Sequence, residues 1–332
     1  MSVIDVHTHV FPRLSRADGR VLTASAEPWL REHGDGTGML MTGADEFRPV
    51  TAPLWDPHAR LAEMDRLGVD VQVISSTPLM FGYGANPSRA ADWCSLVNER
   101  ILAFCAADPA RLIPLCQVPL QDPAAAATMA SRAAAAGHRG VHIGNHVGPR
   151  YLDDPGILDF LRHCAEADVP VLVHPWDMLG ADRMERGYML PWLVAMPAET
   201  QLSILSLMLS GAFEELPRSL RLCFCHGGGS FAYLLGRADN AWHNRDLVRK
   251  DSPRPPSAYT DRFCVDSAVF DPAALALLAR VMGTGRIMLG TDYPFPLGEQ
   301  DPGAAIRSCP DLSGADREAM LGGNARAFFR LP

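Results

Sequence analysis

The stretch Val3-Ile4-Asp5-Val6-His7-Thr8-His9 decides how this chain can fold. Its apolar residues predict a buried strand. The single residue between the histidines places both imidazoles on one face, because side chains alternate with period two along a strand. Two neutral imidazoles at one strand end form half of a typical zinc site. The alternative is a chance pair in a short strand or turn, and the rest of the chain has to decide between the two.

Further apolar runs end in single residues that can bind a metal ion. These runs are 169–173 before His174, 220–225 before His226, and 286–291 before Asp292. Ligands spread over the whole chain need a fold that collects strand ends at one place. The strands alternate with segments of helical spacing, for example 57–67, 123–136 and 272–282. A longer helix, 197–213, is apolar nearly all round, so we expect it to be buried.

Eight such strand and helix units predict an α/β fold, a (β/α)8 TIM barrel, because continuous apolar strands covered by helices form parallel sheets. An open, doubly wound sheet is the alternative. In a barrel, the first, fifth, sixth and eighth strands would bring the candidate residues to a single rim. We expect residues 1–332 to form one barrel domain. The polar segment after the first strand, about 12–55, should form a lid or small subdomain.

Composition narrows the classes of partner and compartment. The net charge of -8 provides no positive field for nucleic acid or anionic lipid. No uninterrupted apolar run approaches the roughly 18 residues of a membrane span. The eight cysteines are scattered without a CxxC pair, which is typical of reduced thiols, so we expect a cytoplasmic protein. Lys250 is the only lysine and lies in a polar stretch, so a lysine bridging two metal ions is not expected.

The strand ends therefore predict one zinc ion per subunit, bound by His7, His9, His174 and Asp292. Zinc lowers the pKa of a bound water to about 7, and Asp292 could also orient that water. His226 is either a further ligand or a free acid/base, and we favour the acid/base role. His142, in the fourth strand, is more consistent with a packed side chain than with a ligand.

Long motifs resemble the amidohydrolase superfamily, and within it a group of zinc-dependent decarboxylases of tryptophan and nitroaromatic catabolism. The segments are HTH at 7–9, FRPV at 47–50, HPWDM at 174–178, PWLVAMPAETQL at 191–202, HGGGSFAYLLGR at 226–237 and GTDYPFPLGE at 290–299. The resemblance covers nearly the whole chain. It implies a (β/α)8 barrel with one zinc ion, no organic cofactor and a small insertion.

The resemblance also implies roles for individual residues. His226 and Asp292 would be catalytic, Arg48 would bind a substrate carboxylate, and Phe295 would form an aromatic wall of the pocket. Arg237 would reach the active site of a neighbouring subunit, which implies a homodimer. Tyr188 stands where a pocket tryptophan is expected. Two arginines suit a small dicarboxylate substrate, because a guanidinium can bind a carboxylate through two parallel hydrogen bonds.

The expected reaction is therefore a non-oxidative decarboxylation by a carbon-carbon lyase (carboxy-lyase). A lactonase or amidase that uses the same site is the main rival, since metal and base would be the same. A binding protein without catalytic activity is a second rival, because one fold can carry many functions.

Overall fold

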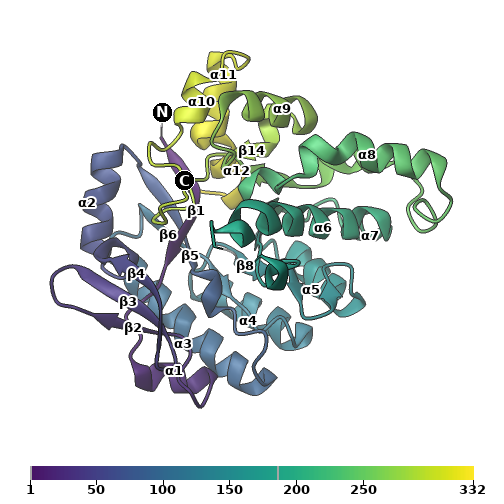
Figure 1. Ribbon diagram of the computed structural model, residues 1–332. Helices are drawn as coiled ribbons and strands as arrows, with labels where there is room; N and C mark the ends of the chain where they lie inside the picture. The colour runs from purple at the N-terminus through teal and green to yellow at the C-terminus, as the bar shows by residue number, and fades with distance from the viewer. Residues whose placement is uncertain (1, 185–186) are drawn as a thin grey trace.

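The computed structural model describes residues 2–184 and 187–332, and its centre is a closed parallel barrel (Figure 1). The strands are β1 (Ile4–Val10), β5 (Val71–Ser76), β6 (Leu112–Pro114) continued by β7 (Cys116–Gln117), β8 (Val141–Gly144), β11 (Val171–His174), β12 (Leu222–Phe224), β13 (Cys264–Asp266) and β14 (Ile287–Met288). Each pairs in parallel with the next along the chain. The predicted (β/α)8 barrel is confirmed.

A seam between the last strand and the first closes the barrel. The Val6 amide donates to the Leu289 carbonyl at 2.9 Å, and the Asp292 amide donates to the His7 carbonyl, also at 2.9 Å. Two residues further on, the His9 amide donates to the Tyr293 carbonyl at 2.8 Å. The two ends of the sequence therefore meet along one line, at the same place as the candidate metal ligands.

Five of the covering helices begin with the same short motif, an Asp or Asn followed by Pro. They are α2 (Pro57–Leu67), α3 (Pro87–Cys105), α4 (Pro123–Ala136), α5 (Pro155–Glu166) and α9 (Pro272–Met282). In each, the Asp or Asn side chain accepts a hydrogen bond from an amide of the first turn. The proline has no amide hydrogen to leave unpaired there. Local chemistry thus fixes where these helices begin.

The predicted helix 197–213 is wrong at its C-terminal end. Helix α6 (Met196–Leu209), preceded by a π-helical turn from Pro191 to Ala195, stops before Gly211, and a separate short helix α7 (Ala212–Glu215) follows. Gly211 has φ of +79°, which a continuing helix excludes. The expected burial is also only partly right, because about half of α6 is buried against the barrel. Residues 191–209 are the one described helix long and apolar enough to cross a membrane.

The insertion after β1 has regular structure that weak sequence periodicity did not reveal. It contains helix α1 (Arg16–Leu22) and an antiparallel sheet of β2 (Trp29–Glu32), β3 (Thr37–Thr42) and β4 (Asp45–Thr51) (Figure 1). Leu30 and Leu40 pack into one apolar cluster with Phe11 at the end of β1. Most residues of β4 are exposed, so few buried apolar positions mark this strand in the sequence. The expected role of residues 12–55 as a lid or small subdomain stays a prediction.

The C-terminal part of the chain completes the helical cover. Helix α8 (Phe231–Asn244) extends away from the body of the barrel (Figure 1). The short helices α10 (Ala304–Ser308) and α11 (Gly314–Glu318) and helix α12 (Asn324–Phe329) lie on the side of the seam. Arg237 and the exposed Tyr233 belong to α8.

Candidate active site

Three histidines and one aspartate meet at the seam: His7 and His9 from β1, His174 from the end of β11, and Asp292 from the segment after β14. The Nε2 atoms of His7 and His9 lie 3.2 Å apart, and Oδ1 of Asp292 lies 3.4 Å and 3.2 Å from them. The ring of His174 is 5.1 Å from the ring of His7 and 5.0 Å from that of His9, between centroids. The ligand atoms of His7, His174, His226 and Asp292 all lie within 4.8 Å of one another. The structure thus brings together all the sequence-predicted metal residues.

The hydrogen bonds of the three histidines fix their tautomers. Nδ1 of His7 faces the Asp266 carboxylate at 2.6 Å, Nδ1 of His9 faces the Ser76 carbonyl at 3.1 Å, and Nδ1 of His174 faces the Pro175 carbonyl at 2.8 Å. These oxygens only accept, so each Nδ1 carries the proton and donates. Each Nε2 therefore points a lone pair toward the Asp292 carboxylate and its neighbours. Converging lone pairs and a carboxylate fit a divalent cation of the zinc type.

The pKa shifts of three of the four residues, His9, His174 and Asp292, favour their metal-binding forms. Burial, followed by the neighbouring imidazoles, holds the pKa of His174 well below its ordinary value, and burial lowers the pKa of His9. Burial alone would raise the pKa of Asp292, but the surrounding histidines outweigh it and hold that pKa well below its usual range. Burial also opposes a charge on His7, but Asp266 outweighs it and raises the pKa of His7. Neutral His9 and His174 and an ionised Asp292 are the forms that bind a metal ion.

His226 differs from the other histidines of the cluster. It begins the turn His226–Gly228 after β12, with φ of +56°, and neither ring nitrogen has a hydrogen-bond partner among the described residues. Its Nε2 lies 3.7 Å from Oδ2 of Asp292. No acceptor fixes its tautomer, which suits a side chain that takes up and releases a proton. Proximity alone also allows a ligand role, so its assignment stays a prediction.

Sequence reasoning missed two buried carboxylates that hold this cluster. Asp266, at the end of β13, bonds His7 through Oδ2 and accepts from the Gly227 amide at 2.7 Å through Oδ1. Asp5 accepts from the Thr291 hydroxyl at 2.6 Å and so ties β1 to the residue before Asp292. Both are fully buried. The signal for Asp266 was present, because it is the last residue of a buried strand.

Arg48 lies beside the metal-site residues on the insertion sheet. Its Cζ is 4.9 Å from the ring centroid of Phe295 and 5.7 Å from that of Trp192, and the ring of Phe295 is 5.5 Å from that of His9. Arg48 forms no ion pair within 2–184 and 187–332. Burial lowers its pKa, opposed by the charge of Asp292. A half-buried guanidinium framed by aromatic rings can receive a carboxylate.

Comparison with known proteins fits this arrangement. The family model described as Amidohydrolase matches residues 4–331. The chain belongs to the amidohydrolase family. It is 40% identical to 2-amino-3-carboxymuconate-6-semialdehyde decarboxylase of Dictyostelium discoideum, over 99% of this chain and 91% of that protein.

Solved structures of other decarboxylases share the fold of this amidohydrolase. One is 5-carboxyvanillate decarboxylase from Sphingomonas paucimobilis, with a TM-score of 0.83 and 25% identity, covering 100% of this chain and 99% of that one. Another is dihydroxybenzoic acid decarboxylase from Polaromonas with bound manganese and an inhibitor, 2-nitroresorcinol. It has a TM-score of 0.79 and 23% identity, covering 99% of this chain and 97% of the other.

Two residues that the sequence assigned to the substrate do not reach the cluster in the single amidohydrolase chain. Tyr188 is 83% exposed in the single chain, and its substrate role stays a prediction, whereas Trp192 lies against Arg48. Arg237 is exposed on α8 and forms no ion pair with any residue of the described chain. Its reach into a second subunit stays a prediction.

A buried polar network holds the segment after His174. The Asn145 side chain accepts from the Trp176 amide at 2.7 Å and donates to Glu199 at 2.9 Å, and the other oxygen of Glu199 accepts from the Leu179 amide at 2.8 Å. Burial raises the pKa of Glu199. His142 is fully buried with its ring 5.7 Å from that of His9 and 4.9 Å from that of Phe81, consistent with the packed role that we expected.

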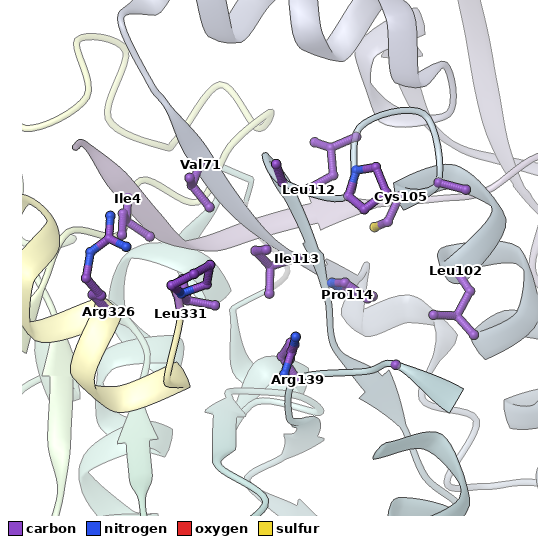
Figure 2. Close-up of a pocket in the computed structure, with 15 residues that line it drawn as sticks. Ile4, Val71, Leu102, Cys105, Leu112, Ile113, Pro114, Arg139, Arg326 and Leu331 are labelled. Atoms are coloured by element: carbon purple, nitrogen blue, oxygen red, sulfur yellow. The ribbon is translucent and has the colours of Figure 1, made fainter. Parts of the chain in front are cut away.

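A separate cavity of about 460 Å³ lies at the other end of the amidohydrolase barrel, where the strands begin (Figure 2). Ile4, Leu112 and Ile113 line it from the strands, Cys105 from α3, and Leu331 from the C-terminal end. Its lining is apolar apart from Arg139 and Arg326. No residue of the histidine cluster contributes to it, so this cavity is distinct from the candidate active site.

Proposed function

We propose that this amidohydrolase is a zinc-dependent decarboxylase that converts 2-amino-3-carboxymuconate 6-semialdehyde into 2-aminomuconate 6-semialdehyde and CO2. The observation that carries the proposal is the half-buried Arg48, without an ion pair among the described residues, beside the buried cluster of His7, His9, His174 and Asp292. The relative named for this decarboxylase, 40% identical over 99% of the chain, supports the choice of substrate. The decarboxylation is a carbon-carbon bond cleavage without an organic cofactor.

His7, His9, His174 and Asp292 would hold the ion. A bound zinc ion would supply a Lewis acid and an activated water molecule near neutral pH. Beside it, Nε2 of His226 would accept a proton and return one to the substrate carbon next to the departing carboxylate. The carboxylate leaves as CO2 with its bonding electron pair remaining on the substrate carbon. Oδ2 of Asp292 lies 3.7 Å from Nε2 of His226, so the proposed acid/base would stand directly beside the residues that hold the ion.

Arg48 would bind a substrate carboxylate, and the rings of Phe295 and Trp192 would exclude water around it. Excluding water strengthens the attraction between the guanidinium and the carboxylate. Arg237, exposed on α8, would bind a substrate carboxylate in the active site of a second copy of the chain, so the proposed enzyme is a homodimer. Its proposed compartment is the cytoplasm. Neither nucleic acid nor a membrane surface is a partner in this proposal.

The decisive experiment uses freshly generated 2-amino-3-carboxymuconate 6-semialdehyde and protein loaded with zinc. We expect the substrate absorbance to disappear with release of one CO2 per substrate molecule, trapped and quantified independently. Protein treated with a chelator and then dialysed is the matched control and should be inactive until zinc is restored. Substrate loss without CO2 would favour the rival lactonase or amidase. No conversion by metal-loaded protein would contradict the proposed substrate.

A further inference from the structure

Arg60, on helix α2, is a fully buried cation beside the seam of the barrel. Its Nη2 donates to the His9 carbonyl at 3.0 Å and its Nη1 donates to the Pro53 carbonyl at 3.4 Å. Its Cζ lies 4.4 Å from the centroid of the Tyr293 ring. The side chain thus touches the end of β1, the end of the insertion, and the residue after Asp292.

Burying this charge without an ion-pair partner among the described residues costs folding free energy, which suggests that Arg60 has a role other than stability. Arg60 is 0% exposed, forms no ion pair with a described carboxylate, and its Nε has no hydrogen-bond partner in the described chain. Apolar side chains of similar volume often serve stability as well as a buried charge or better. Burial lowers the pKa of Arg60 to about 10, so the guanidinium remains charged at neutral pH.

Arg60 contacts the backbone of one candidate metal ligand, His9, and the residue next to another, Asp292, on the opposite side of the seam. On one side it holds the main chain of His9, whose imidazole belongs to the cluster. On the other side it stacks on Tyr293, which is bonded directly to Asp292. The His9 amide also donates to the Tyr293 carbonyl at 2.8 Å, so the two backbones that Arg60 contacts are themselves joined. A planar guanidinium can bond in its plane and stack on its face at the same time.

We propose that Arg60 is a positioning residue that holds His9 and Asp292 in register across the seam and thereby sets the affinity and geometry of the divalent ion. The role rests on the metal site of the proposed function but not on the identity of the substrate. Lysine cannot reproduce it fully, because an ammonium lacks the planar fork that reaches two carbonyls and an aromatic face.

The chain offers a matched control in Arg262, which lies four residues before Asp266 but makes the same kinds of contact with a segment that carries no candidate metal ligand. Arg262 is 8% exposed, donates to the carbonyls of Phe213, Leu216 and Pro217, and lies 5.4 Å from the centroid of the Phe213 ring. None of these partners is a candidate metal ligand or a neighbour of one. Arg262→Met therefore removes a buried, carbonyl-bound guanidinium without touching the site.

The test compares wild type, Arg60→Met, Arg60→Lys and Arg262→Met. Zinc dissociation constants come from competition with a chromophoric chelator, and ligand geometry comes from the visible absorption spectrum of the cobalt-substituted proteins. We expect Arg60→Met to bind zinc about 10 to 100 times more weakly, with an altered cobalt spectrum. Arg60→Lys should lose less affinity. Arg262→Met should keep wild-type affinity and spectrum even where its melting temperature falls.

Circular dichroism and gel filtration identify which Arg60 variants fold. A folded Arg60 variant with the wild-type zinc dissociation constant and cobalt spectrum overturns the proposal, and so does an equal loss of affinity in Arg262→Met. The assay involves no substrate, so a wild type that binds zinc but releases no CO2 contradicts the proposed reaction and leaves this result standing. A wild type that binds no zinc contradicts both.

Discussion

At the scale of single residues, hydrogen bonding separates His226 from its neighbours. His7, His9 and His174 each have an acceptor that fixes Nδ1–H, and His226 has none among the described residues. A histidine with both nitrogens free can exchange protons, whereas one with a fixed tautomer is prepared to bind a metal ion. This contrast underlies the different roles we propose for side chains that lie only a few ångströms apart.

Replacing His226 by alanine should therefore leave the metal content near one ion per chain and lower kcat by about 10² to 10⁴-fold, the usual contribution of a general acid or base. Elemental analysis of the purified variant and a turnover assay check both statements. Loss of the metal together with activity would instead make His226 a ligand. Unchanged turnover would remove it from the mechanism.

Asp266→Asn should weaken metal binding without replacing any ligand. The amide group presents N–H either to His7 Nδ1 or to the Gly227 amide, and both positions require an acceptor. We expect the zinc dissociation constant to rise by about 10 to 100-fold. Chelator competition measures it, with wild-type circular dichroism as the control for folding. An unchanged constant would show that the His7 tautomer needs no such support.

The sequence predicted the residues of the cluster because each ends an apolar strand and the barrel brings strand ends together. It missed Asp266, although that residue also ends a strand, because no second signal distinguished it from an ordinary buried carboxylate. It assigned Tyr188 to the pocket and did not single out Trp192, which contacts Arg48. Which residue of a short segment turns inward depends on its backbone, and Tyr188 has φ of +60°.

At the scale of elements, local rules explain what was predictable. The Asp-Pro and Asn-Pro starts of five helices follow from capping and from the missing amide hydrogen of proline. The antiparallel sheet of the insertion escaped prediction, because β4 is exposed along most of its length and lacks regular alternation. The Asn145 and Glu199 pair joins residues 54 positions apart, which no local pattern reveals.

Glu199→Gln tests how the segment after β11 is held. Both Glu199 oxygens accept hydrogen bonds, so an amide nitrogen would face a donor and destabilise the fold by about 1–3 kcal/mol. Burial raises the pKa of Glu199, so its contribution to stability is largest below the ordinary glutamate pKa and declines as pH rises through the raised value. Urea unfolding at several pH values should show this decline in wild type but not in the variant.

At the scale of the whole molecule, the metal ion would stabilise the closed barrel by joining strands from both ends of the sequence. Its proposed ligands come from β1, β11 and the segment after β14, and that segment is joined to β1 by only a few backbone hydrogen bonds among the described residues. Removing the ion should therefore lower the stability of the entire domain rather than of one loop.

Chelation should lower the melting temperature, and added zinc should restore it. Free zinc at about 1,000 times its dissociation constant contributes about 4 kcal/mol to the folded state. Scanning calorimetry of chelated, zinc-loaded and magnesium-treated protein measures the effect, with magnesium as the control because it prefers oxygen ligands. A melting temperature independent of zinc would contradict a bound ion at the seam.

The seam also orders events during synthesis of the chain. His7 and His9 are translated long before the strand that precedes Asp292. A nascent polypeptide therefore carries half of the site with nothing opposite it until that strand has been synthesised. Uptake of the ion then belongs after this late strand has joined the first strand.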